Sequence, residues 1–289
     1  MTSWADLSCY TSNLAAYLAP ERPRLRAELA GAVRLAVRPE TTAVSHHRRI
    51  DDGRLAYRGA DHWPDAEAAL VAEQEAYGAV LAVANTARLP WSPGYRTAAA
   101  PHWVLLTGRR GGRWSVADHF AATTPLGEHP RYAGQVSGAE LAALLAPVGT
   151  VPAEVANRDR YALGAAVPVP PASAYRWLTR TGGAGLPAET GWLTGPDAIA
   201  HLAVLATEPA RLAALVDDLW AASRHQLFRY RVRSADGLTD PAASAAAEAA
   251  WAELPRALRF AVQSARRGRP RPGVVRAAFD RIAAAEVPA

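Results

Sequence analysis

The chain of 289 residues has one cysteine, one methionine and no lysine, so arginine supplies all 32 basic side chains. A single cysteine excludes an internal disulfide and any zinc site built on paired cysteines. No apolar run reaches the roughly 18 to 20 residues that span a bilayer. The N-terminus also lacks the basic region and apolar core of a signal peptide. We therefore expect a cytoplasmic protein with no membrane association, whose thiol is reduced.

The composition is otherwise that of a globular protein, because half of the residues are hydrophobic. The net charge of +5 is mildly basic, and arginines and acids are interspersed along the chain. This balance does not indicate a nucleic-acid-binding protein, although it would suit an acidic partner. The one basic cluster, Arg266 to Arg271, is expected to be a solvated loop between two C-terminal helices.

The only cysteine, Cys9, lies where a helix is expected to begin. Ser8 is a suitable N-cap and Pro20 ends the segment, and an apolar stripe is formed by Tyr10, Leu14, Tyr17 and Leu18. A sulfur in the first turn of a helix lies at the positive end of its dipole, where the thiolate form is favoured. Free cysteines are also common as small buried hydrophobic residues, so position alone leaves both interpretations open.

The rest of the pattern predicts an α+β protein. Helical periodicity indicates helices over 24–37, 65–78, 197–205, 209–229, 241–263 and 272–285, and after a capping box at Ser137–Glu140. Apolar runs indicate a strand over 79–84 and an antiparallel hairpin of 102–108 with 114–119. Residues 50–57 are expected to form a short strand pair or loop, and 147–195 an irregular crossing with a strand or two. We expect three regions: a core at 1–150, a Pro/Gly-rich segment at 151–195 and a helical region at 196–289.

The hairpin brings together a base and an orienting carboxylate. His102 opens its first strand and Asp118 closes its second, with the turn near residues 110–112. Residues about equally far from a hairpin turn lie nearly opposite each other, so His102 and Asp118 are expected within hydrogen-bonding reach. A helix-borne Cys9 facing that strand end would complete a Cys-His-Asp triad.

The order of these elements resembles the papain-like cysteine protease fold. It is similar to the bacteriocin-leader cysteine peptidases and, more closely, to the N-terminal domain of the butirosin biosynthesis protein H family. The stretches that carry the resemblance are 8–18, 101–108 and 114–118, and the C-terminal helices resemble the helical tail of such proteins. The resemblance implies a papain-like core with Cys on an N-terminal helix and His and Asp on an antiparallel sheet.

The resemblance also implies an activity. Members of that family move an acyl group from an acyl carrier protein to an amine in the biosynthesis of antibiotics and related natural products. For this chain it implies Cys9 as the nucleophile, His102 as the base and Asp118 as the orienting group, with no cofactor and no metal. The expected partners are an acyl or peptidyl carrier protein, which is generally acidic, and a small amine acceptor. The alternatives are a thioesterase, cyclase or peptidase on the same triad, and a non-catalytic module that docks a carrier.

Two positions depart from the peptidase members of the resemblance. Those members have a glutamine shortly before the nucleophile that helps to form the oxyanion hole, whereas this chain offers only Ser3, Asp6 and Ser8 there. Backbone N–H groups at the start of the Cys9 helix are the expected substitute, with Asn13 as a further candidate. Asp118 is followed by His119 instead of proline. The missing glutamine argues against ordinary peptide hydrolysis.

Several other residues have two interpretations. Trp91, Tyr95, Trp103 and Asn13 are candidates for lining a substrate pocket, although aromatic residues are more often core. The other histidines, His46, His47, His62, His119 and His129, lack metal-ligand spacing and are expected on the surface or in loops. The apolar stripe of the C-terminal helices, Leu212, Leu215, Leu219, Leu227 and Phe228, indicates either a core or the face of a homodimer.

Overall fold

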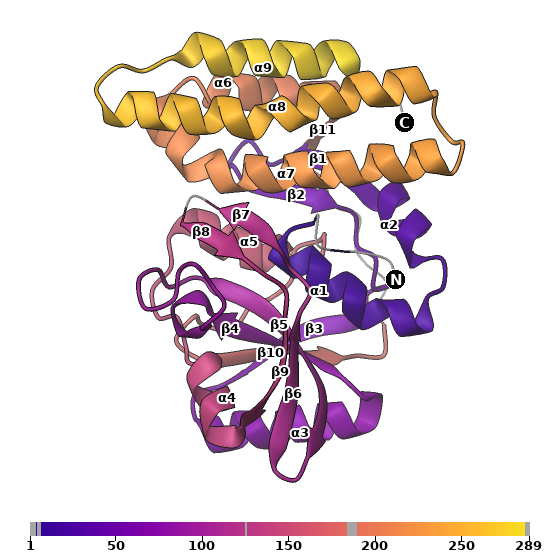
Figure 1. The fold of residues 1–289 in the computed structure, drawn as a ribbon, viewed down its shortest axis with the longest axis vertical. Helices are drawn as coiled ribbons and strands as arrows, with labels where there is room; N and C mark the ends of the chain where they lie inside the picture. Colours follow the sequence, from indigo (N-terminus) through magenta and orange to yellow (C-terminus); the bar gives the residue numbers. More distant parts are fainter. Residues whose placement is uncertain (1–3, 5–6, 125, 184–189, 287–289) are drawn as a thin grey trace. The chain divides into compact units, whose positions relative to one another are not determined.

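A computed structural model describes residues 4, 7–124, 126–183 and 190–286 (Figure 1). The chain divides into two compact units, which we treat separately. Unit 1 comprises residues 1–25 and 51–187, and unit 2 comprises 26–50 and 188–289. This division differs from the three regions expected above. Residues 26–50 belong with the C-terminal helices, and most of the proline-rich segment belongs with the first unit.

Unit 1 is built on a six-stranded antiparallel sheet with the strand order β3-β10-β4-β5-β6-β9. Its strands are β3 (Leu55–Ala60), β10 (Tyr175–Arg180), β4 (Val80–Asn85), β5 (Pro101–Arg110), β6 (Arg113–Asp118) and β9 (Tyr132–Ser137). A separate two-stranded hairpin consists of β7 (Ala122–Thr124) and β8 (Gly127–His129). β10 lies inside the sheet, between β3 and β4, so the crossing segment supplies a strand to the core.

The helices of unit 1 pack on this sheet. They are α1 (Cys9–Leu18), α3 (Trp63–Tyr77), α4 (Gly138–Leu144) and α5 (Ala153–Tyr161), with 3-10 turns η1 (Ala19–Glu21) and η2 (Thr86–Arg88). Leu70 of α3 and Leu141 of α4 join one core with Val104 and Trp114 of the sheet. Tyr10 of α1 meets the ring of Trp103 edge-on, 5.0 Å between centroids. Because side chains alternate along a strand, Val104 and Trp103 face opposite sides of β5.

Unit 2 is a helical layer on a small sheet. The sheet has the order β11-β1-β2, from β1 (Val33–Val37), β2 (Val44–His47) and β11 (Leu193–Thr194). The helices are α2 (Leu25–Ala32), α6 (Gly195–Leu205), α7 (Pro209–Ala235), α8 (Pro241–Arg266) and α9 (Pro272–Ala285). Leu212, Leu215 and Leu219 are buried in its core, which confirms the core interpretation for them. Within the described residues, no helix is both long and apolar enough to cross a membrane.

Most elements expected from the sequence are present. The hairpin forms as predicted, and both bonds of the capping box exist: Glu140 N–H donates to Ser137 Oγ over 3.2 Å, and Ser137 N–H donates to Glu140 Oε2 over 2.6 Å. The helix predicted over 24–37 is wrong in its second half. Its apolar residues recur every four positions, but 33–37 form β1, whose Val37 pairs with Val44 on one side and Leu193 on the other. Strand pairing on both sides overrides the local pattern.

Candidate active site

Cys9 is the first residue of α1. Ser8 caps the helix, because its Oγ accepts the N–H of Thr11 over 3.3 Å. The bond from Ser12 N–H to the Ser8 carbonyl, 2.8 Å long, closes the first turn, so the N–H groups of Cys9 and Tyr10 precede the intrahelical ladder. The cysteine is half-buried, and the positive end of the helix dipole favours a thiolate at this position. The expected helix start and N-cap are confirmed.

A buried ion pair anchors the first turn of α1. The hydroxyl of Tyr10 donates to Asp159 Oδ1 of α5 over 2.6 Å, and Arg176 Nη1 of β10 donates to Asp159 Oδ2 over 2.7 Å. Burial and then the negative charge of Asp159 hold the pKa of Tyr10 well above its ordinary value, so its hydroxyl remains a donor. Tyr10, the residue next to the cysteine, is thus held by hydrogen bonds to α5 and, through Asp159, to the sheet.

Asn13 ties the second turn of α1 to the strand ends. Its Nδ2 donates to the carbonyls of Cys9 and Trp103, over 3.1 and 2.8 Å, and to Asp118 Oδ1 over 3.1 Å. Its Oδ1 accepts the N–H of His119 over 3.0 Å. The side chain is completely buried and both of its polar atoms are engaged. Asn13 therefore positions α1, and this geometry does not support its interpretation as a substrate-binding residue.

A β-bulge sets the face on which Asp118 lies. Near the turn β5 and β6 pair as Arg110 with Arg113, but beyond Thr107 the register shifts, and Leu105 pairs with Ala117. Continued by one step, the shifted register places Asp118 opposite Val104, on the same face as His102. Without the shift Asp118 would lie opposite Leu105, on the other face, because a one-residue slip reverses every side chain. The bulge therefore makes the His102–Asp118 contact possible.

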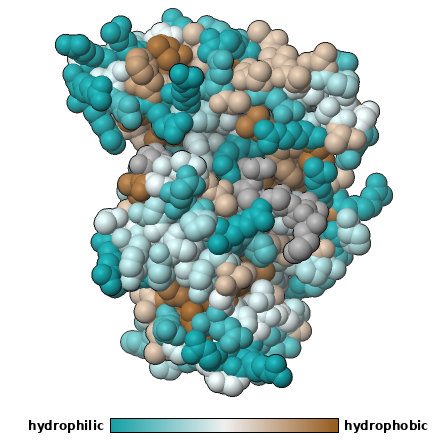
Figure 2. Space-filling view, in the orientation of Figure 1, coloured by the Kyte–Doolittle hydropathy of each residue, from teal (hydrophilic) through white to brown (hydrophobic). Residues whose placement is uncertain are grey.

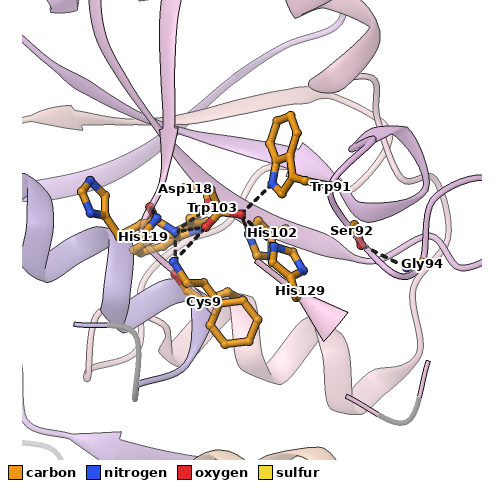
Figure 3. Close-up of polar contacts among 11 residues, drawn as sticks. Cys9, Trp91, Ser92, Gly94, His102, Trp103, Asp118, His119 and His129 are labelled. Atoms are coloured by element: carbon orange, nitrogen blue, oxygen red, sulfur yellow. Dashed lines mark hydrogen bonds and ion pairs between the residues drawn. The ribbon is translucent and has the colours of Figure 1, made fainter. Parts of the chain in front are cut away.

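Asp118 accepts five hydrogen bonds. Its Oδ2 accepts His102 Nε2 over 2.7 Å, His129 Nε2 over 2.9 Å and Trp91 Nε1 over 2.9 Å (Figure 3). Its Oδ1 accepts Asn13 Nδ2 and the N–H of Phe120, over 3.1 and 3.0 Å. Burial disfavours the carboxylate, but the charge of His102 and these donors outweigh it, so the pKa of Asp118 lies far below its ordinary value. The group is an anion with a fixed orientation.

His102 is buried between this anion and the thiol. Burial lowers the pKa of the imidazole, but the charges of Asp118 and Cys9 and hydrogen bonds to both raise it to about 10. Because Nε2 of His102 is hydrogen-bonded to Asp118, Nδ1 is the ring nitrogen available to interact with the sulfur of Cys9. A charged imidazole beside a thiol is an arrangement that activates a cysteine nucleophile. The structure thus brings His102 and Asp118 together, as the hairpin spacing predicted, and Cys9 is near enough to His102 to contribute to its raised pKa.

The aromatic residues proposed as pocket lining have different roles. Trp91 donates to Asp118 and stacks on Tyr132, with 3.7 Å between ring centroids, so it belongs to the support of the triad. Trp103 is completely buried against Tyr10 and Tyr57. Its ring fills the core, so this geometry does not support its assignment to a substrate pocket. Tyr95 is exposed on the loop after η2, where Arg96 lies over its ring. The role of Tyr95 as a substrate contact remains a prediction.

The side chains considered for an oxyanion hole are engaged elsewhere or lie outside the described residues, so backbone N–H groups are the remaining candidates. Ser3 and Asp6 lie outside the described residues, and Ser8 Oγ is used as the cap of α1. Asn13 is fully engaged, as described above. The N–H groups of Cys9 and Tyr10 are the described donors nearest to the sulfur in the chain, and a helix N-terminus is suited to a developing oxyanion.

His129 is the residue of the site that sequence reasoning missed. It is almost fully buried at the end of β8, and its ring stacks on that of His102 with 4.9 Å between centroids. Its expected place on the surface is wrong, as is that of His47, which is buried in β2. Nothing in the sequence signals the contact, because residue 129 is eleven positions from Asp118 and on a separate hairpin.

His102, Asp118 and His129 also have the composition of a metal site with two histidines and one carboxylate. Both Nε2 atoms lie at hydrogen-bond distance from the same oxygen, and Trp91 donates to that oxygen as well. These N–H groups satisfy the carboxylate without an ion, whereas a metal would require both Nε2 atoms to be deprotonated. The hydrogen-bonded arrangement therefore fits the triad better than a metal centre.

The imidazolium of His102 has a measurable consequence. Since the pKa of His102 is raised to about 10, the ring stays charged from acid pH through neutrality. We expect the ring-proton NMR signals of His102, identified by their loss in His102→Gln, to keep imidazolium chemical shifts from pH 6 to pH 8. An ordinary histidine loses most of its charge over this range. Titration of these signals near pH 6.5 would contradict the raised pKa.

Comparison with known proteins adds no relative to this description. No protein-family model matches the chain, and no curated protein matches it significantly.

Proposed function

We propose that unit 1 is a cysteine acyltransferase with the triad Cys9, His102 and Asp118. The observation that carries the proposal is the 2.7 Å contact of His102 Nε2 with Asp118, together with a cysteine at a helix N-terminus that is among the groups raising the pKa of His102. The papain-like fold is part of the same proposal. It is supported by a cysteine on an N-terminal helix and by a histidine and a carboxylate on adjacent antiparallel strands.

The proposed reaction has two steps. The Cys9 thiolate attacks the carbonyl of a thioester, a new C–S bond forms, and the donor thiol leaves with the proton of His102. The neutral His102 then takes a proton from an amine as its nitrogen attacks the acyl-cysteine. The C–N bond forms, the C–S bond to Cys9 breaks, and the imidazolium–thiolate pair is restored. Asp118 keeps Nε2 protonated in both steps and stabilises the imidazolium.

Two features support transfer from a thioester over peptide hydrolysis. The glutamine that helps the related peptidases to stabilise the oxyanion is missing, and Asn13 is bound to protein groups and does not replace it. Thioesters are more reactive acyl donors than amides and need less such stabilisation. The donor, an acyl or peptidyl carrier protein, the amine acceptor and the setting in natural-product biosynthesis rest on the family resemblance.

The test is intact-mass measurement after incubation with an acylated carrier protein. Because Cys9 is the only cysteine, an acyl adduct that neutral hydroxylamine removes must be a thioester on that residue. We expect a stoichiometric adduct on the unchanged protein and none on Cys9→Ala. An adduct that persists in Cys9→Ala, or no adduct from any thioester donor, would exclude this function.

Candidate amines distinguish transfer from hydrolysis. A transferase should lose its adduct much faster when the acceptor is present, with one amide formed for each adduct lost. A thioesterase or cyclase would lose it at the same rate with and without amines. A carrier-docking module without catalysis would bind the carrier and form no adduct.

A further inference from the structure

The net charge of the chain is concentrated in one segment. Residues 253–286 hold eight arginines and three acids, a net charge of +5, while the rest of the chain holds 24 of each. The sequence-based interpretation of interspersed charge is therefore wrong for this segment. All eight arginines are exposed on α8, on α9 or on the loop 267–271 between them, and this placement confirms the loop expected there.

Most of these arginines have no acidic partner among the described residues. Arg281 pairs with Glu253 over 2.8 Å. The other seven have no ion pair within the described part of the chain: Arg256, Arg259, Arg266, Arg267, Arg269, Arg271 and Arg276. A cluster of unneutralised guanidinium groups repels itself, so an anionic partner would stabilise it.

An exposed aromatic residue lies within the cluster. Arg256 and Phe260 of α8 recur at helical spacing with Arg267, the C-cap residue of the helix, opposite the face that buries Leu254 and Leu258. Phe260 is 50% exposed. In Figure 2 the corner of unit 2 at the α8–α9 loop is mostly hydrophilic. We call Arg256, Arg259, Phe260, Arg266 and Arg267 the arginine face.

We propose that the arginine face binds an acidic protein domain, with Phe260 at the centre of the contact. Guanidinium groups bind carboxylates in a bidentate manner, and arginine with aromatic residues is enriched in the centres of protein interfaces. The stripe spans eleven residue-to-residue steps from Arg256 to Arg267, about 16 Å, a length that one helix of a partner can cover. Nucleic acid or an anionic membrane could also bind the arginines. The single half-exposed phenylalanine within the helical stripe favours a protein as the partner.

The carrier protein is the partner on which the proposal is tested, and that choice rests on the proposed function. The test measures the affinity of the full chain for an acyl carrier protein by calorimetric titration. We expect Arg259→Glu/Arg267→Glu to weaken binding at least tenfold and Phe260→Ala to weaken it about fivefold. The matched control is Arg58→Glu/Arg110→Glu, which reverses the same charge at two exposed positions of unit 1. It should change the affinity less than twofold.

Three results would overturn the proposal: no carrier binding, equal weakening in the control, or tighter binding of duplex DNA or phosphatidylglycerol vesicles than of the carrier. Acylation of Cys9 by a small acyl-N-acetylcysteamine separates this proposal from the proposed function. If the small thioester acylates Cys9 but charge reversal leaves carrier affinity unchanged, docking fails and the acyltransferase stands. If the carrier binds through the arginine face but Cys9 takes no acyl group, the acyltransferase fails and docking stands.

Discussion

Asp118→Asn is expected to reduce acyl transfer about ten-thousandfold. Asparagine has the shape of aspartate, but its amide nitrogen is a hydrogen-bond donor. His102 Nε2 carries a proton and donates to Asp118, and two donors cannot bond to each other. With the amide nitrogen facing it, Nε2 must instead lose its proton and accept the bond. The ring would then hold its proton on Nδ1, the ring nitrogen that Asp118 leaves available to the thiol. In that tautomer the ring cannot accept the thiol proton, so the nucleophile is not activated.

The same substitution removes the charge that raises the pKa of His102 to about 10. That pKa should fall, and the ring-proton NMR signals of His102 should titrate between pH 6 and pH 8. The control is Asp52→Asn, a substitution of an exposed carboxylate in the same unit. It should leave the rate of acyl transfer and the pH profile unchanged. Retention of more than a tenth of the transfer rate in Asp118→Asn would remove Asp118 from the triad.

Arg176→Met is expected to cost unit 1 about 3 to 5 kcal/mol of unfolding free energy. The guanidinium of Arg176 and the carboxylate of Asp159 are both almost fully buried and lie 2.7 Å apart. Without the arginine, Asp159 becomes a buried charge whose remaining partner is the hydroxyl of Tyr10. Hydrogen exchange of the β4 and β5 amides reports the loss, because both strands lie inside the sheet of unit 1.

The triple variant Arg176→Met/Asp159→Leu/Tyr10→Phe tests the cause. It replaces the whole network by apolar groups, so no charge or hydroxyl is left unsatisfied, and most of the lost stability should return. If the triple variant is as unstable as Arg176→Met, packing and not the unpaired charge is responsible. The triple variant should also transfer acyl groups more slowly, because Tyr10 no longer fixes the first turn that carries Cys9.

Local pattern was sufficient for the helix at Cys9 and for the hairpin of His102 and Asp118. In both, the informative residues are neighbours in the chain: Ser8 caps the helix that follows it, and the glycines at 111 and 112 form the turn between adjacent strands. Local pattern was insufficient for β1, where pairing with β2 and β11 decided the outcome. It also missed the place of β10 inside the sheet, because that strand pairs with segments about 90 to 120 residues away.

By itself, the sequence determined which side chains are the candidates for the chemistry: one thiol, a histidine at the start of a strand and an aspartate at the end of the next. Only the tertiary structure decided how they are oriented. The bulge beyond Thr107 turns Asp118 to the face of His102, and Trp91 and His129 reach the same oxygen from separate segments. The physical reason is that short-range patterns specify helices and turns, whereas a one-residue register shift and contacts between distant segments depend on packing of the whole unit.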